Sequence, residues 1–156
     1  MGTFGQDFAI LFGRELDHLA EEVAAYRSDA DLWSTMGAQK NPPGTLALHT
    51  AGGLMAMIGT ALGGTGYVRD RDREFSERDV SRDEVVSRVR ECRDTIVPIL
   101  AGLDDATLAA PHPGRVPPHM QGVTTHAFLL HLLWHVGWHL GHIYYHRLGL
   151  AGGGPV

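Results

Sequence analysis

The sequence predicts an all-α fold, a four-helix bundle with long connections. Apolar residues recur three and four positions apart over long stretches, which is typical of amphipathic helices. Segments rich in glycine and proline separate these stretches, and no segment alternates polar and apolar residues as a strand would. With 156 residues, 44% of them hydrophobic, the chain can bury one core, and we expect residues 1–156 to form a single domain.

The first helix is predicted over residues 4–26. Its apolar side chains share one stripe, and charged residues such as Arg14 and Glu21 fall outside it. The stripe consists of Phe4, Phe8, Leu11, Phe12, Leu16, Leu19, Val23 and Tyr26.

The second helix is predicted over residues 45–62, with Thr45 as its N-cap, after the stop signal Asn-Pro-Pro-Gly at residues 41–44. No charged residue occurs between Lys40 and Arg69. The helix also contains glycines, each of which lowers helix propensity by about 1 kcal/mol relative to alanine. Such a helix needs burial against its neighbours, so we expect it to be among the most enclosed elements.

Charges of both signs alternate from residue 69 to residue 94, which we interpret as a solvated, salt-bridged face. Residues 81–84 (Ser-Arg-Asp-Glu) match a capping box, so the third helix is predicted to begin at Arg82. Cys92 falls on the apolar stripe of this helix and is interpreted as a buried apolar residue rather than a nucleophile. Pro98 is expected to kink the helix or to end it early.

The fourth helix is predicted over residues 124–148, with Gly149 as its stop signal, after a proline-rich segment at 108–122 that we expect to be irregular. No charged residue occurs from Val116 to His146, which is long enough to consider a membrane span. We reject that interpretation, because a histidine on every turn would place unpartnered polar groups in hydrocarbon. The sequence therefore predicts no membrane association.

The fourth helix carries a stripe of histidines in the spacing that a bundle helix uses for its core seam. Filling a seam with imidazoles forgoes about 1.5–3 kcal/mol per position relative to leucine, and each buried ring needs partners for both nitrogens. The stripe therefore indicates that something polar occupies the bundle interior. It consists of Phe128, His131, His135, His139, His142 and His146.

A divalent cation is the simplest occupant of that interior. Two histidines four residues apart on a helix can share one metal, as His135 and His139 would. His49, in the middle of the uncharged second helix, can supply a third ligand. Three neutral nitrogen ligands leave one coordination position free, as in catalytic zinc sites. We expect zinc first, although nickel, cobalt, iron and copper also suit imidazole ligands.

Three other interpretations stay open. The histidines can form a structural hydrogen-bonded network, or a non-catalytic site for a metal or a haem. A di-iron carboxylate site is less compatible with the sequence, because it needs two Glu-x-x-His motifs and the chain has only one, at residues 15–18. The histidines outside the stripe are not expected to be ligands; these are His18, His112, His119 and His126.

Several segments resemble motifs of the DinB-like superfamily. Residues 135–142 (His-Val-Gly-Trp-His-Leu-Gly-His) are similar to the C-terminal signature of that family, a histidine, three residues and then His-Arg-Gly-Gln. Residues 43–53 resemble its first-histidine motif, and residues 67–76 resemble the linker after the second helix of some members. The chain departs from the signature at Leu140 and His142, where the family has arginine and glutamine.

The resemblance implies a DinB-like four-helix bundle that holds a divalent metal on three histidines and acts on a small molecule. Some relatives transfer or isomerise substrates with a low-molecular-weight thiol such as bacillithiol or mycothiol. We therefore expect a thiol-dependent S-transferase or a hydrolase. His131 and His142 are candidates for proton transfer, because imidazole titrates near neutral pH. The ligands implied are His49, His135 and His139.

Charge and composition narrow the partners and the location. The formal net charge of −5 argues against a nucleic-acid partner. The single cysteine and the acidic, amphipathic N-terminal residues are not typical of a secreted protein, so we expect a cytoplasmic one. Trp134, Trp138 and Tyr145 share a second apolar face of the fourth helix, which predicts packing against another subunit in a homodimer.

Overall fold

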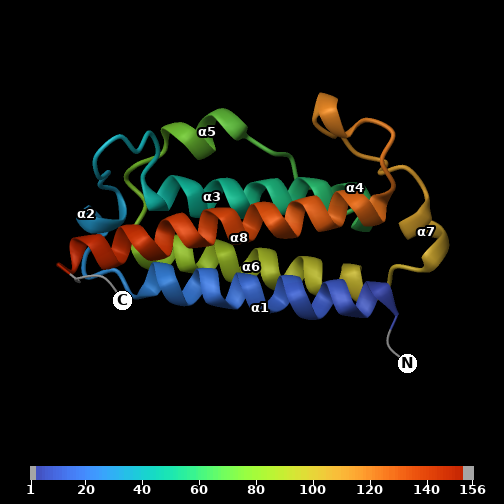
Figure 1. Ribbon diagram of the computed structural model, residues 1–156, viewed down its shortest axis with the longest axis horizontal. Coiled ribbons are helices and arrows are strands. Elements are labelled where there is room, and N and C mark those ends of the chain that lie inside the picture. The colour runs from blue at the N-terminus through green and yellow to red at the C-terminus, as the bar shows by residue number, and fades with distance from the viewer. Residues whose placement is uncertain (1–2, 153–156) are drawn as a thin grey trace.

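The computed structural model describes residues 3–152, and it confirms the predicted all-α bundle (Figure 1). Among these residues no strand occurs, and the one β-type pairing is an isolated bridge between Pro111 and Thr124. Helix α3 (Pro43–Leu54) continues without a break through the π-helical turn η1 (Met55–Thr60) and α4 (Ala61–Gly63). The four long helices are α1 (Phe4–Ala24), α3 (Pro43–Leu54), α6 (Arg82–Ala101) and α8 (Thr125–Leu150).

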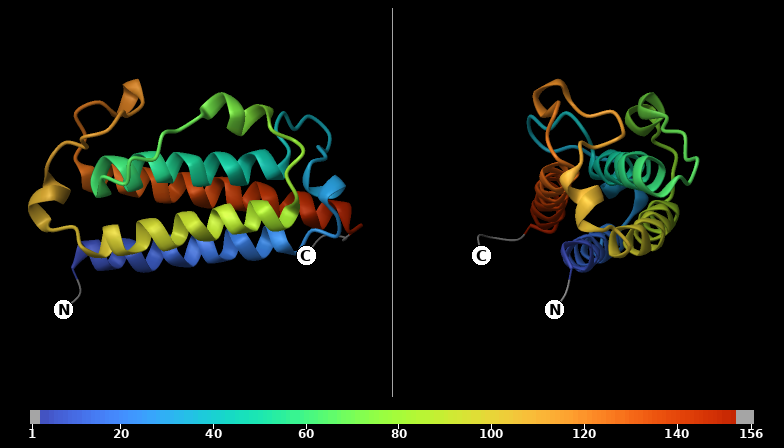
Figure 2. Two further views of the ribbon diagram at one scale, coloured as in Figure 1. Left: turned by 180° about the vertical axis from the view of Figure 1, so that it is seen from behind. Right: turned by 90° about the vertical axis from the view of Figure 1, so that its right-hand side faces the viewer.

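Seen end-on, the long helices occupy the corners of a square in the order α1, α6, α3, α8 (Figure 2, right). Helices α1 and α8 run in one direction, and α3 and α6 run in the other (Figure 1). Because α3 and α6 are parallel neighbours, the chain between them must return along the bundle. It does so as a strap over the outer side of α3, and this strap contains the short helix α5 (Arg71–Ser76).

The core is built from the apolar stripes of the long helices. The predicted stripe of α1 is confirmed for six of its eight members, whereas Phe4 is exposed and Leu11 is only partly buried. Cys92 is fully buried, and burial raises the pKa of its thiol to about 12, with a smaller contribution from Glu91. The thiol is therefore neutral near neutral pH, as expected for a core residue. The buried members of the α1 stripe are Phe8, Phe12, Leu16, Leu19, Val23 and Tyr26.

The start of α3 differs from the predicted one. The helix begins at Pro43 with Pro42 as its N-cap, because a proline in the first turn needs no partner for an N–H group. The predicted cap, Thr45, lies inside the helix, where its hydroxyl is buried without a hydrogen-bond partner.

Two predicted stop signals do not end their helices. Pro98 lies on the exposed side of α6, where water can hydrate the carbonyl that the missing N–H leaves free, and the helix runs on to Ala101. Gly149 lies inside α8, and a Cβ atom there would come within 2.6 Å of the Met36 side chain. This glycine therefore permits a close approach rather than a helix end.

Three short helices were not predicted. These are α2 (Asp29–Leu32), α5 in the strap, and α7 (Asp105–Ala109), whose end overlaps the segment expected to be irregular. That segment also contains the 3-10 turn η2 (Pro118–Met120). Each of the three α-helices begins with an aspartate or serine side chain that accepts a hydrogen bond from the first turn.

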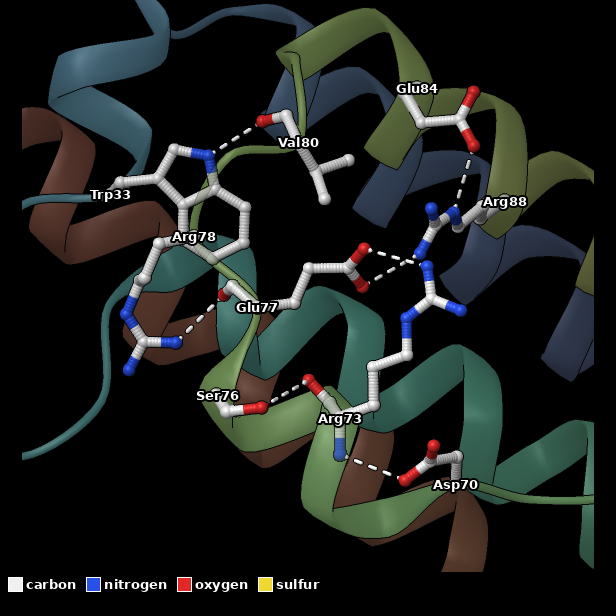
Figure 3. Close-up of polar contacts among 9 residues, drawn as sticks. All are labelled: Trp33, Asp70, Arg73, Ser76, Glu77, Arg78, Val80, Glu84 and Arg88. Carbon is white, nitrogen blue, oxygen red and sulfur yellow. Dashed lines mark hydrogen bonds and ion pairs between the residues drawn. The ribbon is translucent and has the colours of Figure 1, made fainter.

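Charged contacts tether the strap to α6 (Figure 3). Asp70 begins α5 by accepting a hydrogen bond from the backbone N–H of Arg73, at 2.9 Å. Glu77 accepts hydrogen bonds from Arg73 and from Arg88 of α6, each at 3.0 Å, and Arg88 also donates to Glu84 at 2.9 Å. The stretch interpreted as a solvated face is thus in part a tether that positions α5.

One helical stretch of the described residues, Pro43–Gly63, is long and apolar enough to cross a bilayer, with a mean hydropathy of 1.4. In the most apolar 18 residues of this stretch, 44% are buried, and the core helix of a soluble bundle can be equally long and apolar. The finding is therefore weak support for a membrane helix.

Candidate metal centre

Three histidines converge between α3 and α8. The candidate ligand nitrogens of His49, His135 and His139 all lie within 4.8 Å of one another. The Nε2 atoms of His135 and His139 are 3.0 Å apart. The ring centroid of His49 lies 5.6 Å from that of His135 and 5.5 Å from that of His139. The structure thus brings together the three side chains that the sequence singled out as ligands.

The geometry and the protonation of this cluster suit a divalent cation. In a tetrahedral metal site, ligand nitrogens at about 2.0–2.1 Å from the metal lie about 3.3 Å from one another. Small rotations of the three histidine rings would therefore bring their nitrogens to one ion. Burial lowers the pKa of His135 to about 4, and the charges of His49, His131 and Arg69 act in the same direction. Burial, followed by the neighbouring imidazoles, lowers the pKa of His139 to about 3. Both rings are neutral near neutral pH and offer lone pairs.

Glu74 and Arg69 of the strap contact the outer nitrogen of His49. The Nδ1 atom lies 3.2 Å from Oε2 of Glu74 and 3.0 Å from Nη2 of Arg69. Arg69 also donates to both carboxylate oxygens of Glu74, at 2.8 Å each. Burial would raise the pKa of Glu74, but the hydrogen bonds from His49 and Arg69 outweigh it, and the pKa lies below its ordinary value. Glu74 is therefore an ionised carboxylate although it is only 7% exposed.

The two strap residues make opposite demands on His49. A carboxylate only accepts hydrogen bonds and a guanidinium only donates them, so Nδ1 cannot bond to both. Since Arg69 is already satisfied by Glu74, a proton on Nδ1 that is donated to Glu74 gives the better set of contacts. That tautomer leaves the other nitrogen, Nε2, unprotonated, as a metal ligand requires.

The carboxylate of Glu74 reaches His49 because residue 52 has no side chain. A Cβ atom on Gly52 would lie 2.2 Å from Oε1 of Glu74 and 2.9 Å from its Cδ. The roles of Glu74 and Arg69 could not be predicted from the sequence, because a run of alternating charges gives no sign that two of its members face a partly buried histidine. Gly52, three residues after His49, was a local sign that something approaches α3 closely.

A cavity of about 200 Å³ adjoins the cluster. His49 and His135 line it, together with His131, which is partly buried and stacks on His135 with a centroid distance of 6.3 Å. Burial, and secondarily the charge of His119, lowers the pKa of His131. His142, the other predicted proton-transfer residue, is exposed, lies edge-on against Trp138 and does not line this cavity.

The interpretation of the histidine stripe as the core seam of α8 is wrong for most of its members. His131, His135 and His139 are only partly buried. They lie beside the core-facing side of α8, and His131 and His135 line the cavity next to α3. His146 is buried, but its Nδ1 pairs with the hydroxyl of Tyr26 at 3.0 Å, away from the cluster. The buried residues of α8 are Thr125, Phe128, Leu129, Leu132, Val136, Ile143 and His146.

The histidines outside the stripe do not belong to the cluster. The Nε2 atom of His112 lies 2.9 Å from the carbonyl oxygen of Met57. His126 packs edge-on against Phe8, and His119 against His131. Within residues 3–152, the only group of three or more histidine, cysteine and acidic side chains close enough to hold a metal is His49, His135 and His139.

The lowered pKa values predict how the metal-free protein responds to acid. A histidine in the unfolded chain has a pKa of about 6.5. Below that pH, His135 and His139 are therefore protonated in the unfolded chain but remain neutral in the folded protein. The free energy of unfolding should therefore fall as the pH drops from about 6.5 towards about 4, by up to about 1.4 kcal/mol per pH unit for each histidine. Urea titrations in the presence of a chelator measure this slope. A double His135→Gln, His139→Gln variant should flatten it, and an equal slope in both proteins would contradict the prediction.

Comparison with known proteins agrees with this architecture. A family model described as the DinB superfamily matches residues 13–143. Among solved structures, the chain is similar to a DinB-like protein from Bacillus cereus ATCC 10987, with a TM-score of 0.66 and 16% sequence identity, over 88% of this chain and 86% of that chain. At this identity the likeness shows the fold alone. No curated protein matches the chain.

Proposed function

The chain belongs to the DinB superfamily, as its motifs indicated, and on that premise we propose that it is an enzyme that uses one divalent cation, with zinc as the first candidate. The ligands would be His49, His135 and His139. The observation that carries the proposal is the convergence of these imidazoles from two helices beside a cavity. The depressed pKa values of His135 and His139 support it, because protons would not compete with a metal near neutral pH.

When bound, such a cation would act as a Lewis acid and would lower the pKa of a thiol or a water molecule. The chain's own residues would orient the ligands and move protons. Glu74 would hold the proton of His49 on Nδ1 and so fix the tautomer and the ring. His131 lines the cavity, and its lowered pKa makes it neutral near neutral pH, so it would accept a proton there. His142 remains the second candidate for proton transfer, from the outer side of α8.

The cavity indicates the class of substrate. Most of its lining is apolar, including Leu54, Met57, Phe128 and Leu132, and the exposed Arg71 also lines it. Such a lining suits a small molecule with an apolar part and an anionic group. We propose transfer of a low-molecular-weight thiol to an electrophile as the reaction, with hydrolysis of an ester or amide as the alternative. A cytoplasmic location, where such thiols are kept reduced, would accord with this chemistry.

The test is a comparison of zinc-loaded and metal-free protein. Each is mixed with an electrophilic acceptor with and without a low-molecular-weight thiol, and separately with small esters and amides. The proposal expects zinc-dependent consumption of the acceptor that requires the thiol. Zinc-dependent hydrolysis without thiol would replace the transferase by the hydrolase. Substoichiometric metal in protein expressed with supplemented zinc would overturn the metal centre and favour a structural histidine network.

A further inference from the structure

Within residues 3–152, no other element lies over the outer side of α8 (Figure 2, right), and large apolar side chains are exposed on this side. Four of its five large side chains are half exposed or more, and the rings of Trp134 and Trp138 pack on each other at a centroid distance of 5.8 Å. Contiguous exposed apolar surface of this kind marks an interaction site. The side chains and their exposed fractions are Leu130 50%, Trp134 58%, Trp138 54%, Tyr144 36% and Tyr145 70%.

Two glycines lie within this face, four residues apart. Because successive residues of a helix turn by 100°, Gly137 and Gly141 fall on the same side as Leu130 and Trp134. A Cβ atom built on either glycine would meet nothing within 4 Å, so packing within the subunit does not require a glycine at these positions. Small residues four apart leave a groove that lets the backbone of another helix approach closely.

The charge of the face favours a second copy of the chain as the partner. No charged residue occurs from Val116 to His146, although each copy carries a net charge of −5. Arg147, whose guanidinium lies over the Tyr144 ring at the edge of the face, is paired with Glu22 at 2.7 Å. Two copies would therefore meet there with little like-charge repulsion. A helix that lies on a membrane surface ordinarily carries lysine and arginine on its polar face, and the stretch from Val116 to His146 has neither.

The aromatic rings of the face supply a large part of the area that a dimer needs. Fully buried aromatic side chains contribute about 150–250 Å² each. The exposed parts of the four rings then supply about 300–500 Å² per subunit by the same estimate. The rings of two subunits together then supply about half to four-fifths of the roughly 1,200 Å² of a small stable interface, before Leu130 and the glycine backbone are added. A twofold axis would place the aromatic ridge of each copy in the glycine groove of the other.

We propose that this face of α8 is the interface of a twofold homodimer. None of its five large side chains lines the cavity beside the histidine cluster, so association leaves that cavity open. Trp134 is the link between the two regions, because its ring lies 5.6 Å from the ring centroid of His131. The inference does not depend on the proposed function, since the face would be an interface in a protein with or without a metal.

The experiment is light scattering with size-exclusion chromatography over a concentration series of the full chain. The wild-type protein should have twice the subunit mass of 17.0 kDa. Replacing Gly137 and Gly141 by leucine fills the groove, and the new Cβ atoms would meet nothing within 4 Å inside the subunit. We expect the dimer dissociation constant to rise by about 30-fold or more, the size of an interface hot spot. Tyr145→Glu, which places a charge on the face, should act in the same direction.

The matched control is Ile10→Glu, at an isoleucine of α1 that is 68% exposed but lies away from this face. This variant should keep the dimer, and circular dichroism should show that all variants remain helical. A wild-type particle of 17.0 kDa at every concentration would overturn the proposal. So would a dimer that the α8 variants leave intact, or wild-type monomers that sediment with phosphatidylcholine vesicles, since the face would then bind lipid.

Discussion

Replacing His139 by alanine should abolish stoichiometric zinc binding. His139 and His135 supply the pair of Nε2 atoms that stand 3.0 Å apart, so its loss removes half of the contribution of α8 to the site. Residues that only orient a ligand are worth about 10–100-fold in metal affinity. Loss of a ligand itself should therefore weaken zinc binding by more than about 100-fold. Competition with a chromophoric chelator measures the affinity, and the absorption bands of the cobalt-substituted protein report the coordination.

The matched control is His18→Ala. This histidine lies exposed on α1 and belongs to the one Glu-x-x-His motif of the chain. Its replacement should leave both the affinity and the cobalt spectrum unchanged. If His139→Ala bound zinc as tightly as the wild-type protein, the cluster would be a structural network, whereas a loss of binding in His18→Ala would indicate a carboxylate site on α1 instead.

The helices could be predicted because their apolar periodicity is read directly from the chain, but their ends depend on distant contacts. Pro98 lies on the exposed side of α6 and Gly149 lies against Met36 of a connection far away in sequence. Neither circumstance leaves a local mark, so both residues look like stop signals. Thr45 resembles an N-cap for the same reason, although the two prolines before it already begin the helix.

The candidate ligands could be predicted because histidine is rare in apolar helices and two of the three lie four residues apart. Their depth could not be predicted. Residues spaced three and four apart lie on one side of a helix, and α8 has two neighbouring sides with such residues. The histidines lie on one of them. The side that faces the core is centred on Leu132 and Val136. Glu74 lies 25 residues from His49 in sequence, and only the path of the strap brings them together.

The contact between the strap and α3 leads to the second large effect, in a variant that leaves every ligand in place. Gly52→Ala should weaken zinc binding by about 10–100-fold, the range for loss of a group that orients a ligand. The new Cβ would lie 2.2 Å from Oε1 of Glu74. Because this oxygen ends a flexible side chain, the carboxylate would move away, and Nδ1 of His49 would be left with Arg69, which can only donate. That partner favours the tautomer with the proton on Nε2, the nitrogen needed for the metal.

Gly53→Ala is the control, since a Cβ at this neighbouring glycine would lie 3.5 Å from Nη2 of Arg69, an ordinary contact. Both substitutions raise helix propensity by about 1 kcal/mol, so a difference between them reports the carboxylate and not the helix. Chelator competition should show near wild-type affinity for Gly53→Ala, and Glu74→Ala should reproduce the loss seen in Gly52→Ala. Glu74→Ala should also lower the free energy of unfolding by about 1–3 kcal/mol, because it leaves the partly buried guanidinium of Arg69 without its carboxylate partner. Equal zinc affinities for Gly52→Ala and Gly53→Ala would show that the strap does not control the tautomer of His49.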